Sequence, residues 1–594
     1  MRPLVVVLLL FGLALSVTVV PGVFTIDDNN YLINVIALRQ GRLTVANTEG
    51  LSPSRELFSF DPGPWAREVK ATPVASSAPP LYAVLALPFS WLGWRGLVGL
   101  NTIAYVTTVA LVFAYARRYS TKASTPWLAA AAFGLGGFVI EYAQGVWPHT
   151  LSIALCAAGI FAAGRVIEDG GVPRAVASGL LLGLATGVRY QNAVIVAVIG
   201  GCLAVWSANR WRALAAFALG AAVPLSASAF INHVRLDSWN PISKGEGYLN
   251  VPVVVSTAGS LFAPVTMFWA RLVDFSVRPP LVGPNFSWVD YDSLTGAHLM
   301  LGTTLQKAFL QSAPWAILAL IVLVLAWVPR FRMAPHYRRQ LQVLSIVSLA
   351  VLMTFAFSGV QRHEGLSFNQ RYLLELLPLV AVGFAWSLDE IRVSVRPLFL
   401  GALLGVMIVL LILVGTPVRG GPESSLWLVR QLSLLKLPLL FAIGLGAMWW
   451  VARSRAGARP LLAATVGLCL GWGMTLHLGD DVMASRELRS SKRAETNVLG
   501  SVLPDHSAYV AYSGFKDAAF PLLINRDIVI LDVRADEGVD APMLIRELLG
   551  QKRRVFVLRG GFPAKVLSRV VEGLDVASVA SGLDVVELRI RLSH

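Results

Sequence analysis

Long runs of apolar residues are the feature that most constrains this chain. They recur from the N-terminus to about residue 478 and are each about 17 to 22 residues long. A helix of that length crosses about 30 Å of hydrocarbon with its backbone polar groups hydrogen-bonded internally. Of the 594 residues, 55% are hydrophobic and 14% are charged. The sequence therefore predicts a multi-pass α-helical membrane protein.

About thirteen spans are expected. The first run, which follows Arg2, could be a cleaved signal peptide, but no small-x-small site follows it and an uncleaved helix is preferred. The segment "STAGSLFAPVTMFWARLVDF" at 256–275 contains proline and charge, which favours an interfacial or re-entrant segment, with a span as the alternative. The predicted spans start near residues 4, 96, 126, 146, 174, 192, 212, 311, 340, 371, 397, 437 and 460.

The basic residues form short clusters between apolar runs. Their placement satisfies the positive-inside rule if the N-terminus is cytoplasmic. Segments 23–95, 232–310 and everything after 478 are then external to the plasma (inner) membrane. The net charge of +15 therefore reflects topology rather than nucleic-acid binding. The cytoplasmic clusters contain Arg117, Arg118, Lys122, Arg165, Arg174, Arg210, Arg212, Arg330, Arg332, Arg338, Arg339, Arg392, Arg396, Arg453, Arg455 and Arg459.

The composition beyond residue 478 is that of a soluble domain. The runs "SAYVAYSG", "DIVILDV", "RVFVLRG" and "LDVVELRI" predict strands, and "APMLIRELLGQKR" and "FPAKVLSRVVEG" predict helices between them. We therefore expect a transmembrane domain at 1–478 and a small external α/β domain with a largely parallel sheet at 479–594. A stabilising or acceptor-guiding role is expected for the second domain. The three cysteines all lie in apolar runs and indicate no metal or redox site.

Two adjacent acids, Asp27 and Asp28, come directly after the first apolar run, in "FTIDDNNY" at 24–31. Residues 27–43 have the pattern of a short interfacial helix that stops at Gly41. One aspartate could serve only as the N-cap of that helix, but a cap requires one acid and two are present. The pair is therefore a candidate for chemistry on the external face.

Further motifs follow in order: "PPLY" at 79–82, "GLLLGLATGVRYQN" at 179–192 and "FNQRYLLELLPLVAVG" at 368–383. Together with Asp27, Asp28, Tyr31 and Gly41, they make residues 1–480 similar to the GT-C class of glycosyltransferases. The resemblance is to the group that contains protein O-mannosyltransferases and the lipid A aminoarabinose transferase, which use polyprenyl-phosphate sugars. There are two departures: Asp28 stands where the group has glutamate, and Ala78 stands where the aminoarabinose transferase has lysine.

The resemblance implies an inverting transfer of a sugar from a polyprenyl-phosphate donor to a hydroxyl of a lipid, glycan or protein acceptor. Because the donor carries its own leaving group, the protein must deprotonate the acceptor and stabilise the departing phosphate. Asp27 is the expected base, and Asp28 is its partner for orientation, charge or an optional divalent cation. No other cofactor is expected.

Cationic side chains at external helix ends are candidates for the phosphate, although helix-end arginines also snorkel to ordinary lipid headgroups. The candidates for donor-phosphate binding are Arg371, Arg189, Arg362 and His363. Those for the substrate pocket are Tyr31, Tyr82, Glu141, His149 and Tyr372. Acceptor contacts are considered at Trp288, Asp290, Tyr291 and Asp292 in the loop 282–298, against the alternative of an ordinary structured loop.

Three other functions remain open. A transporter or flippase would have many helices too, but it would be expected to show internal repeats or mid-span charges, of which Glu375 is the nearest example. A non-catalytic scaffold or sensor would use the C-terminal domain to bind partners. A glycan polymerase or ligase would be expected to lack the acidic pair after its first helix.

Overall fold

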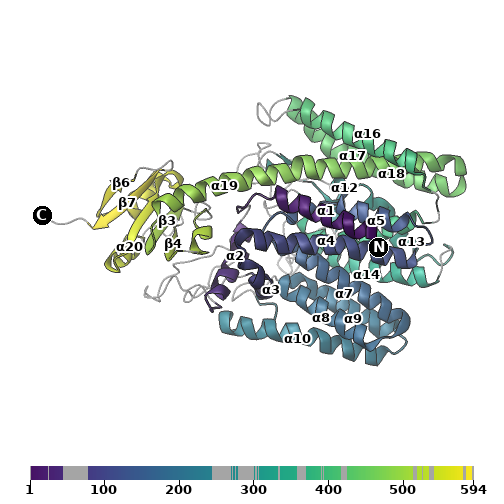
Figure 1. Ribbon diagram of the computed structural model, residues 1–594, viewed down its shortest axis with the longest axis horizontal. Helices are drawn as coiled ribbons and strands as arrows, with labels where there is room; N and C mark the ends of the chain where they lie inside the picture. The colour runs from purple at the N-terminus through teal and green to yellow at the C-terminus, as the bar shows by residue number, and fades with distance from the viewer. Residues whose placement is uncertain are drawn as a thin grey trace, which may run out of the picture.

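The computed structural model consists mainly of helices, with strands concentrated near the C-terminus (Figure 1). It describes residues 2–23, 26–43, 78–243, 307–331, 335–357, 369–389, 391, 393–416, 425–512, 518–524, 526–533, 541–579 and 584–590, with 269, 272–273, 276–277, 300–301 and 304–305. The elements of the N-terminal half are α1 (Arg2–Thr18), α2 (Ile26–Arg39), α3 (Pro80–Ser90), α4 (Gly93–Tyr119), α5 (Thr125–Gly134), α6 (Val139–Tyr142), α7 (His149–Asp169), α8 (Val172–Val188), the short 3-10 helix η1 (Tyr190–Asn192), α9 (Ala193–Trp206) and α10 (Arg210–Leu236).

The second half of the bundle begins after a two-stranded hairpin and ends in a long helix. Its elements are β1 (Met300–Leu301), β2 (Thr304–Leu305), α12 (Phe309–Ser312), α13 (Ala316–Leu325), α14 (Pro335–Phe357), the 3-10 helix η4 (Arg371–Leu376), α15 (Leu377–Ser387), α16 (Val395–Gly415), α17 (Ser425–Ser454), η5 (Ala456–Ala458), α18 (Arg459–Leu476), the π-helical turn η6 (His477–Asp481) and α19 (Val482–Val502).

The apolar runs form helices as expected. A helix begins within five residues of twelve of the thirteen predicted starts. The exception is α17, which begins at Ser425 rather than near 437. Six helical stretches of the described chain are long and apolar enough to cross a membrane: Gly93–Tyr119, His149–Asp169, Arg210–Leu236, Val395–Gly415, Leu432–Ser454 and Ala456–Val502. Several other apolar helices are shorter. The chain is thus a multi-pass membrane protein. The segment 256–275 lies almost entirely outside the described residues.

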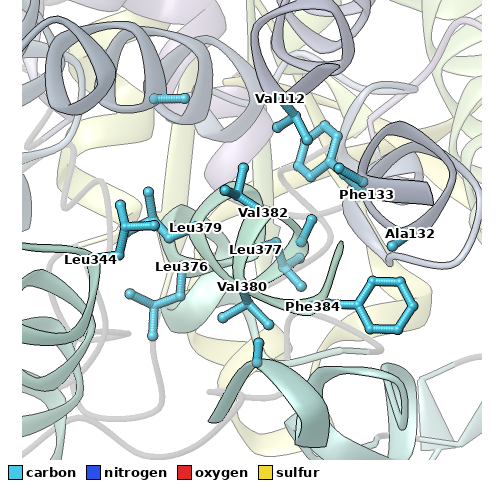
Figure 2. Packing of buried hydrophobic residues seen from close by; sticks show 14 of the residues in the cluster. Val112, Ala132, Phe133, Leu344, Leu376, Leu377, Leu379, Val380, Val382 and Phe384 are labelled. Atoms are coloured by element: carbon cyan, nitrogen blue, oxygen red, sulfur yellow. The ribbon is translucent and has the colours of Figure 1, made fainter. Parts of the chain in front are cut away.

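Helix α15 forms the centre of the bundle. All of its residues are buried, which explains why it is apolar on every side rather than along one stripe. Figure 2 shows Leu377, Val380 and Phe384 of α15 surrounded by apolar side chains of other helices. The surrounding side chains labelled there are Val112 of α4, Ala132 and Phe133 of α5, and Leu344 of α14.

Helices α16 and α18 pack at close range along two pairs of glycines. A Cβ atom added at Gly467 would meet the carbonyl oxygen of Leu398, and one added at Gly401 would meet that of Ala464. Gly405 and Gly471 repeat these contacts one turn further on. The motifs "GALLG" and "GLCLG" therefore have the small-xxx-small spacing by which membrane helices approach backbone to backbone.

The C-terminal region contains a five-stranded sheet with the strand order β4-β3-β5-β7-β6. β3 pairs in parallel with β4 and β5, whereas β7 runs antiparallel to β5 and β6. The sheet is therefore mixed, and the expectation of a largely parallel sheet is wrong for its second half. Its elements are β3 (Ser507–Tyr512), η8 (Phe520–Ile524), β4 (Ile528–Val533), α20 (Ala541–Gly550), β5 (Arg554–Leu558), η9 (Arg559–Gly561), α21 (Ala564–Val570), β6 (Leu574–Ser578) and β7 (Val585–Ile590).

Helix α19 continues α18 and η6 and leads from the bundle to this sheet (Figure 1). The position 478, where the sequence changes in composition, lies inside the π-helical turn between α18 and α19. The buried residues of the sheet, such as Tyr509 and Phe556, belong to the same hydrophobic cluster as Leu32 of α2 and Leu81 of α3. The C-terminal region is therefore packed onto α2, which carries the acidic motif, and onto α3.

Candidate active site

The two aspartates of the acidic motif lie in the first turn of α2, which begins at Ile26. Both acids follow the first residue of the helix, so neither is its N-cap. A carboxylate in the first turn is nevertheless stabilised by the helix dipole. The side chain of Asp28 is completely buried. The side chain of Asp27, the expected base, lies outside the described residues.

Asp28 meets a buried arginine of α19 beside the turn that follows α6. A Cβ atom added at Gly145 would lie 3.2 Å from Asp28 Oδ1 and 2.8 Å from Arg489 Nη2. Arg489 is also completely buried, and it interacts electrostatically with both Asp28 and Glu141. Two of the predicted acids, one from α2 and one from α6, therefore converge on one guanidinium.

An asparagine of α4 fixes the turn on which this convergence depends. Asn101 Nδ2 donates hydrogen bonds to the carbonyl oxygens of Gly145, at 2.6 Å, and Trp147, at 2.7 Å. Tyr82 lies close by, at 3.4 Å between its hydroxyl and the Asn101 amide, and its ring packs edge-on against Tyr31 with centroids 5.2 Å apart. Tyr31 and Tyr82, two of the residues predicted for the substrate pocket, thus lie against each other.

The hydroxyl of Tyr82 is held in its protonated form. Burial raises the pKa of Tyr82 well above its usual value. The contact with Asn101 lowers that pKa in part, and the nearby carboxylate of Asp28 raises it again. A neutral phenol beside a carboxylate retains a proton with which it can donate a hydrogen bond.

Glu141 continues this polar site into a second buried cluster. Asn369 Nδ2 donates to Glu141 Oε2 at 2.8 Å and to Asp481 Oδ2 at 2.8 Å. Asp481 also accepts a hydrogen bond from Lys307 at 2.6 Å and contacts His477 Nδ1 at 2.8 Å. All of these side chains are buried. They come from α6, the residues just before η4, the π-helical turn η6 and the segment before α12.

Two of the predicted phosphate-binding arginines lie in different settings. Arg189 forms a buried ion pair with Glu375, with Nη1 and Oε1 2.5 Å apart, so its charge is already compensated within the bundle. Arg371 lies over the ring of the following residue, Tyr372, at 5.1 Å, and donates to its hydroxyl at 3.2 Å. The other two predicted cations, Arg362 and His363, lie outside the described residues.

His149 lies between these arginines and the turn at Gly145. Its ring packs against Tyr142 and Trp147, with centroids 4.9 and 5.2 Å away, and it is close enough to Arg189 and Arg371 to interact electrostatically. Among the described residues, its Nδ1 atom has no hydrogen-bond partner. The predicted acceptor contacts in the loop 282–298 lie outside the described residues.

Arg235 of α10 is a buried cation that the sequence did not single out. Its Nη2 atom donates to the carbonyl oxygen of Ala78 at 3.3 Å and to Asn34 Oδ1 at 3.4 Å. The guanidinium of Arg235 therefore lies against Ala78, the position at which the sequence analysis noted a lysine in the aminoarabinose transferase.

The sequence missed the basic members of the site more often than the acidic ones. Arg489 lay in a segment assigned to a soluble domain, where charges are normal. The best available signal was "HLGDD" at 477–481, which puts a histidine and two acids at the end of an apolar run. Those residues form the π-helical turn, an irregularity that is frequent at functional sites.

The described residues do not offer a set of ligands for the optional divalent cation. No three histidine, cysteine or acidic side chains of that part of the chain lie close enough together to hold a metal ion. Between Asp28 and Glu141, the positive charge is supplied by Arg489.

The chain is a membrane protein with the fold of the GT-C glycosyltransferases. The crystal structure of ArnT from Cupriavidus metallidurans bound to undecaprenyl phosphate aligns with a TM-score of 0.53 and 14% identity, over 98% of this chain and 97% of that one. ArnT in the apo state aligns over the same shares with a TM-score of 0.51 and 14% identity. The resemblance to this class is thus confirmed for the fold. No protein-family model and no curated protein matches the chain.

Proposed function

We propose that this protein is a glycosyltransferase that moves a sugar from a polyprenyl-phosphate donor to an acceptor hydroxyl on the outer face of the plasma membrane. The observation that carries the proposal is the convergence of Asp28 and Glu141 on Arg489, within a fold shared with a structure that binds undecaprenyl phosphate. A lipid, glycan or protein can supply the hydroxyl.

In the proposed reaction, Asp27 takes the proton of the acceptor hydroxyl as its oxygen bonds to the anomeric carbon. The bond from that carbon to the phosphate oxygen breaks, and the polyprenyl phosphate leaves with the electron pair. Attack opposite the leaving group inverts the anomeric configuration. Asp28 is fixed beside Arg489 and orients either the acceptor or the base, Asp27.

The departing phosphate requires donors that are in place before the reaction. We assign this task to Arg371 and to Arg235, which lies against Ala78 at the start of α3. Arg189 has its charge balanced by Glu375 and acts in this scheme by holding η4. Arg362 and His363 are retained as further phosphate contacts.

The proposed topology has thirteen spans, a cytoplasmic N-terminus and an external region from 479 to 594. It follows from the arginine clusters between the helices. This topology puts Asp28, Glu141 and the C-terminal sheet on the side of the membrane where the lipid-borne sugar would be presented. The sheet then lies next to α2, in a position to guide a large acceptor.

A lipid flippase is the second candidate. It is favoured by charged side chains buried in the bundle, namely the pairs Lys307–Asp481, Arg430–Asp480 and Arg189–Glu375. Each charge in these three pairs has a fixed partner in the protein, which argues against a role in carrying an ion across the membrane. Loss of either protein would remove one sugar residue from a glycan, so the two candidates differ in the side of the membrane on which the lipid-linked sugar accumulates.

The test compares polyprenyl-phosphate sugars and envelope glycans by mass spectrometry in host cells. The strains carry the wild type, Asp27→Asn, Asp28→Asn or a deletion, with Asp237→Asn as the matched control because that aspartate is exposed on the end of α10. At equal membrane abundance, we expect both site variants to behave like the deletion, with one lipid-linked sugar accumulating and one glycan residue missing.

Other outcomes separate the candidates. If Asp27→Asn behaves like the wild type, Asp27 is not the base. If the deletion leaves both pools unchanged, the transferase is excluded. A flippase would instead change the side of the membrane on which the lipid accumulates.

A further inference from the structure

Arg489 is the side chain that connects the C-terminal part of the chain to the buried acids. It is carried by α19, which ends at Val502, five residues before the first strand of the sheet. Its side chain is completely buried, and its Nη1 atom lies 3.3 Å from the hydroxyl of Ser485. A guanidinium at this depth is costly unless negative charge is close to it.

The negative charge comes from two segments far apart in the sequence. Asp28 of α2 and Glu141 of α6 both interact electrostatically with Arg489. The two carboxylates would repel each other in a site of low dielectric if no cation lay near both. A shared guanidinium removes that repulsion and gives each acid a fixed neighbour.

Two glycines allow other parts of the chain to approach α19 closely at Arg489. A side chain at Gly145 would come within 2.8 Å of Arg489 Nη2, and one at Gly22 would come within 2.5 Å of the Arg489 carbonyl oxygen. Gly22 also has a positive φ of 155°, which other residues rarely adopt. The turn after α6 is therefore fitted to the guanidinium of Arg489, and the connection between α1 and α2 is fitted to the backbone of α19 at that residue.

We infer that Arg489 is a positioning residue that neutralises Asp28 and Glu141 and holds both carboxylates at one site. The inference rests on the proposed function for its catalytic meaning, because it assigns to α19 the task of keeping the acids in place for transfer. It also gives the C-terminal segment a direct part in the reaction centre, beyond stabilising the fold or guiding an acceptor.

The first test is a double-mutant cycle that needs no activity. Full-length protein is purified in detergent as wild type, Arg489→Met, Asp28→Asn and the double variant, and the midpoint of thermal denaturation is measured. We expect Arg489→Met to lower the midpoint, and Asp28→Asn to lower it less in that background than in the wild type, or to raise it. Additive shifts would show that Arg489 only fills space, and would overturn the inference.

A milder pair covers the case in which Arg489→Met does not fold. Gly145→Ala adds a methyl group beside the guanidinium, and Arg489→Lys replaces the planar fork with a narrower amine. Gly145→Ala is expected to cost less stability in the Arg489→Lys background than in the wild type. An equal cost in both backgrounds would place Arg489 away from Gly145 and contradict the inference.

The second test measures sugar transfer in cells as described above. At equal abundance, Arg489→Met is expected to reduce transfer about tenfold or more, and Arg489→Lys to retain part of it. Arg493→Gln, one turn further along α19 and exposed, is the control and is expected to transfer normally. Normal transfer by Arg489→Met would overturn the positioning role. If the stability coupling is found but Asp28→Asn transfers normally, the proposed function fails while the pairing of Arg489 with Asp28 is supported.

Discussion

The ion pair between Lys307 and Asp481 has no access to solvent on either side. Removing one partner leaves a buried charge, which typically costs about 3 to 5 kcal/mol. We therefore expect Lys307→Met to lower the thermal midpoint of the detergent-solubilised protein strongly, and the double variant Lys307→Met/Asp481→Asn to recover much of the loss. Lys492→Met is the control, because its pair with Glu495 is partly exposed and worth about 1 kcal/mol or less. Equal losses in the single and double variants would contradict the prediction.

Single residues of the site were predictable when their own position was unusual. Asp28 and Glu141 stood out because acids beside apolar runs are costly and need a reason. Their partners did not stand out, because the contacts join distant parts of the chain: Lys307 and Asp481 are 174 positions apart. Arg189 and Glu375, 186 positions apart, show the same limit, since only the fold reveals that their charges cancel.

The contact between α16 and α18 gives a prediction about whole helices. Both helices place glycines where a Cβ atom would collide with the backbone of the other, so Gly467→Ala must push them apart. We expect this variant to lower the thermal midpoint and the amount of protein in the membrane. Gly444→Ala on α17 is the matched control, since a Cβ there has nothing within 4 Å. Equal behaviour of the two variants would show that the helices separate without cost.

Helices were easier to predict than strands for a physical reason. An apolar run has to form a helix in lipid because every backbone group needs a partner within the segment. The early start of α17 was missed because Arg430 and Lys436 interrupt its hydropathy. β6 was missed because it is mostly exposed and lacks the alternation of a half-buried strand. The antiparallel direction of β7 depends on how the chain returns after β6, which no local pattern encodes.

At the scale of the whole molecule, the sheet and the acidic motif belong to one packed unit. The hydrophobic cluster of the sheet includes residues of α2 and α3, and α19 brings Arg489 to the acids. The amino-acid composition changes near residue 478 because the residues before it include those that face lipid. The packing of buried side chains continues across that position. The predicted division at residue 478 therefore separates a lipid-facing part of the chain from a polar part, although the two parts share one hydrophobic cluster.

The arrangement of the molecule across the membrane can be tested with cysteines. The native ones, Cys156, Cys202 and Cys469, are buried and should not react with a charged thiol reagent that cannot cross the membrane. Ser568→Cys lies on the exposed surface of α21, and Ser454→Cys lies on the exposed end of α17, next to a predicted cytoplasmic arginine cluster.

In intact spheroplasts of an expressing bacterium, we expect the reagent to label Ser568→Cys at once and Ser454→Cys only after the membrane is permeabilised. Labelling is measured by mass shift on the purified protein, with the wild type as the control for native cysteines. The reverse pattern would put Asp28, Glu141 and Arg489 on the cytoplasmic side, because α19 joins them to the sheet. A polyprenyl-linked sugar presented on the outer face could then not reach the acids, so this experiment tests the topology on which the proposed reaction depends.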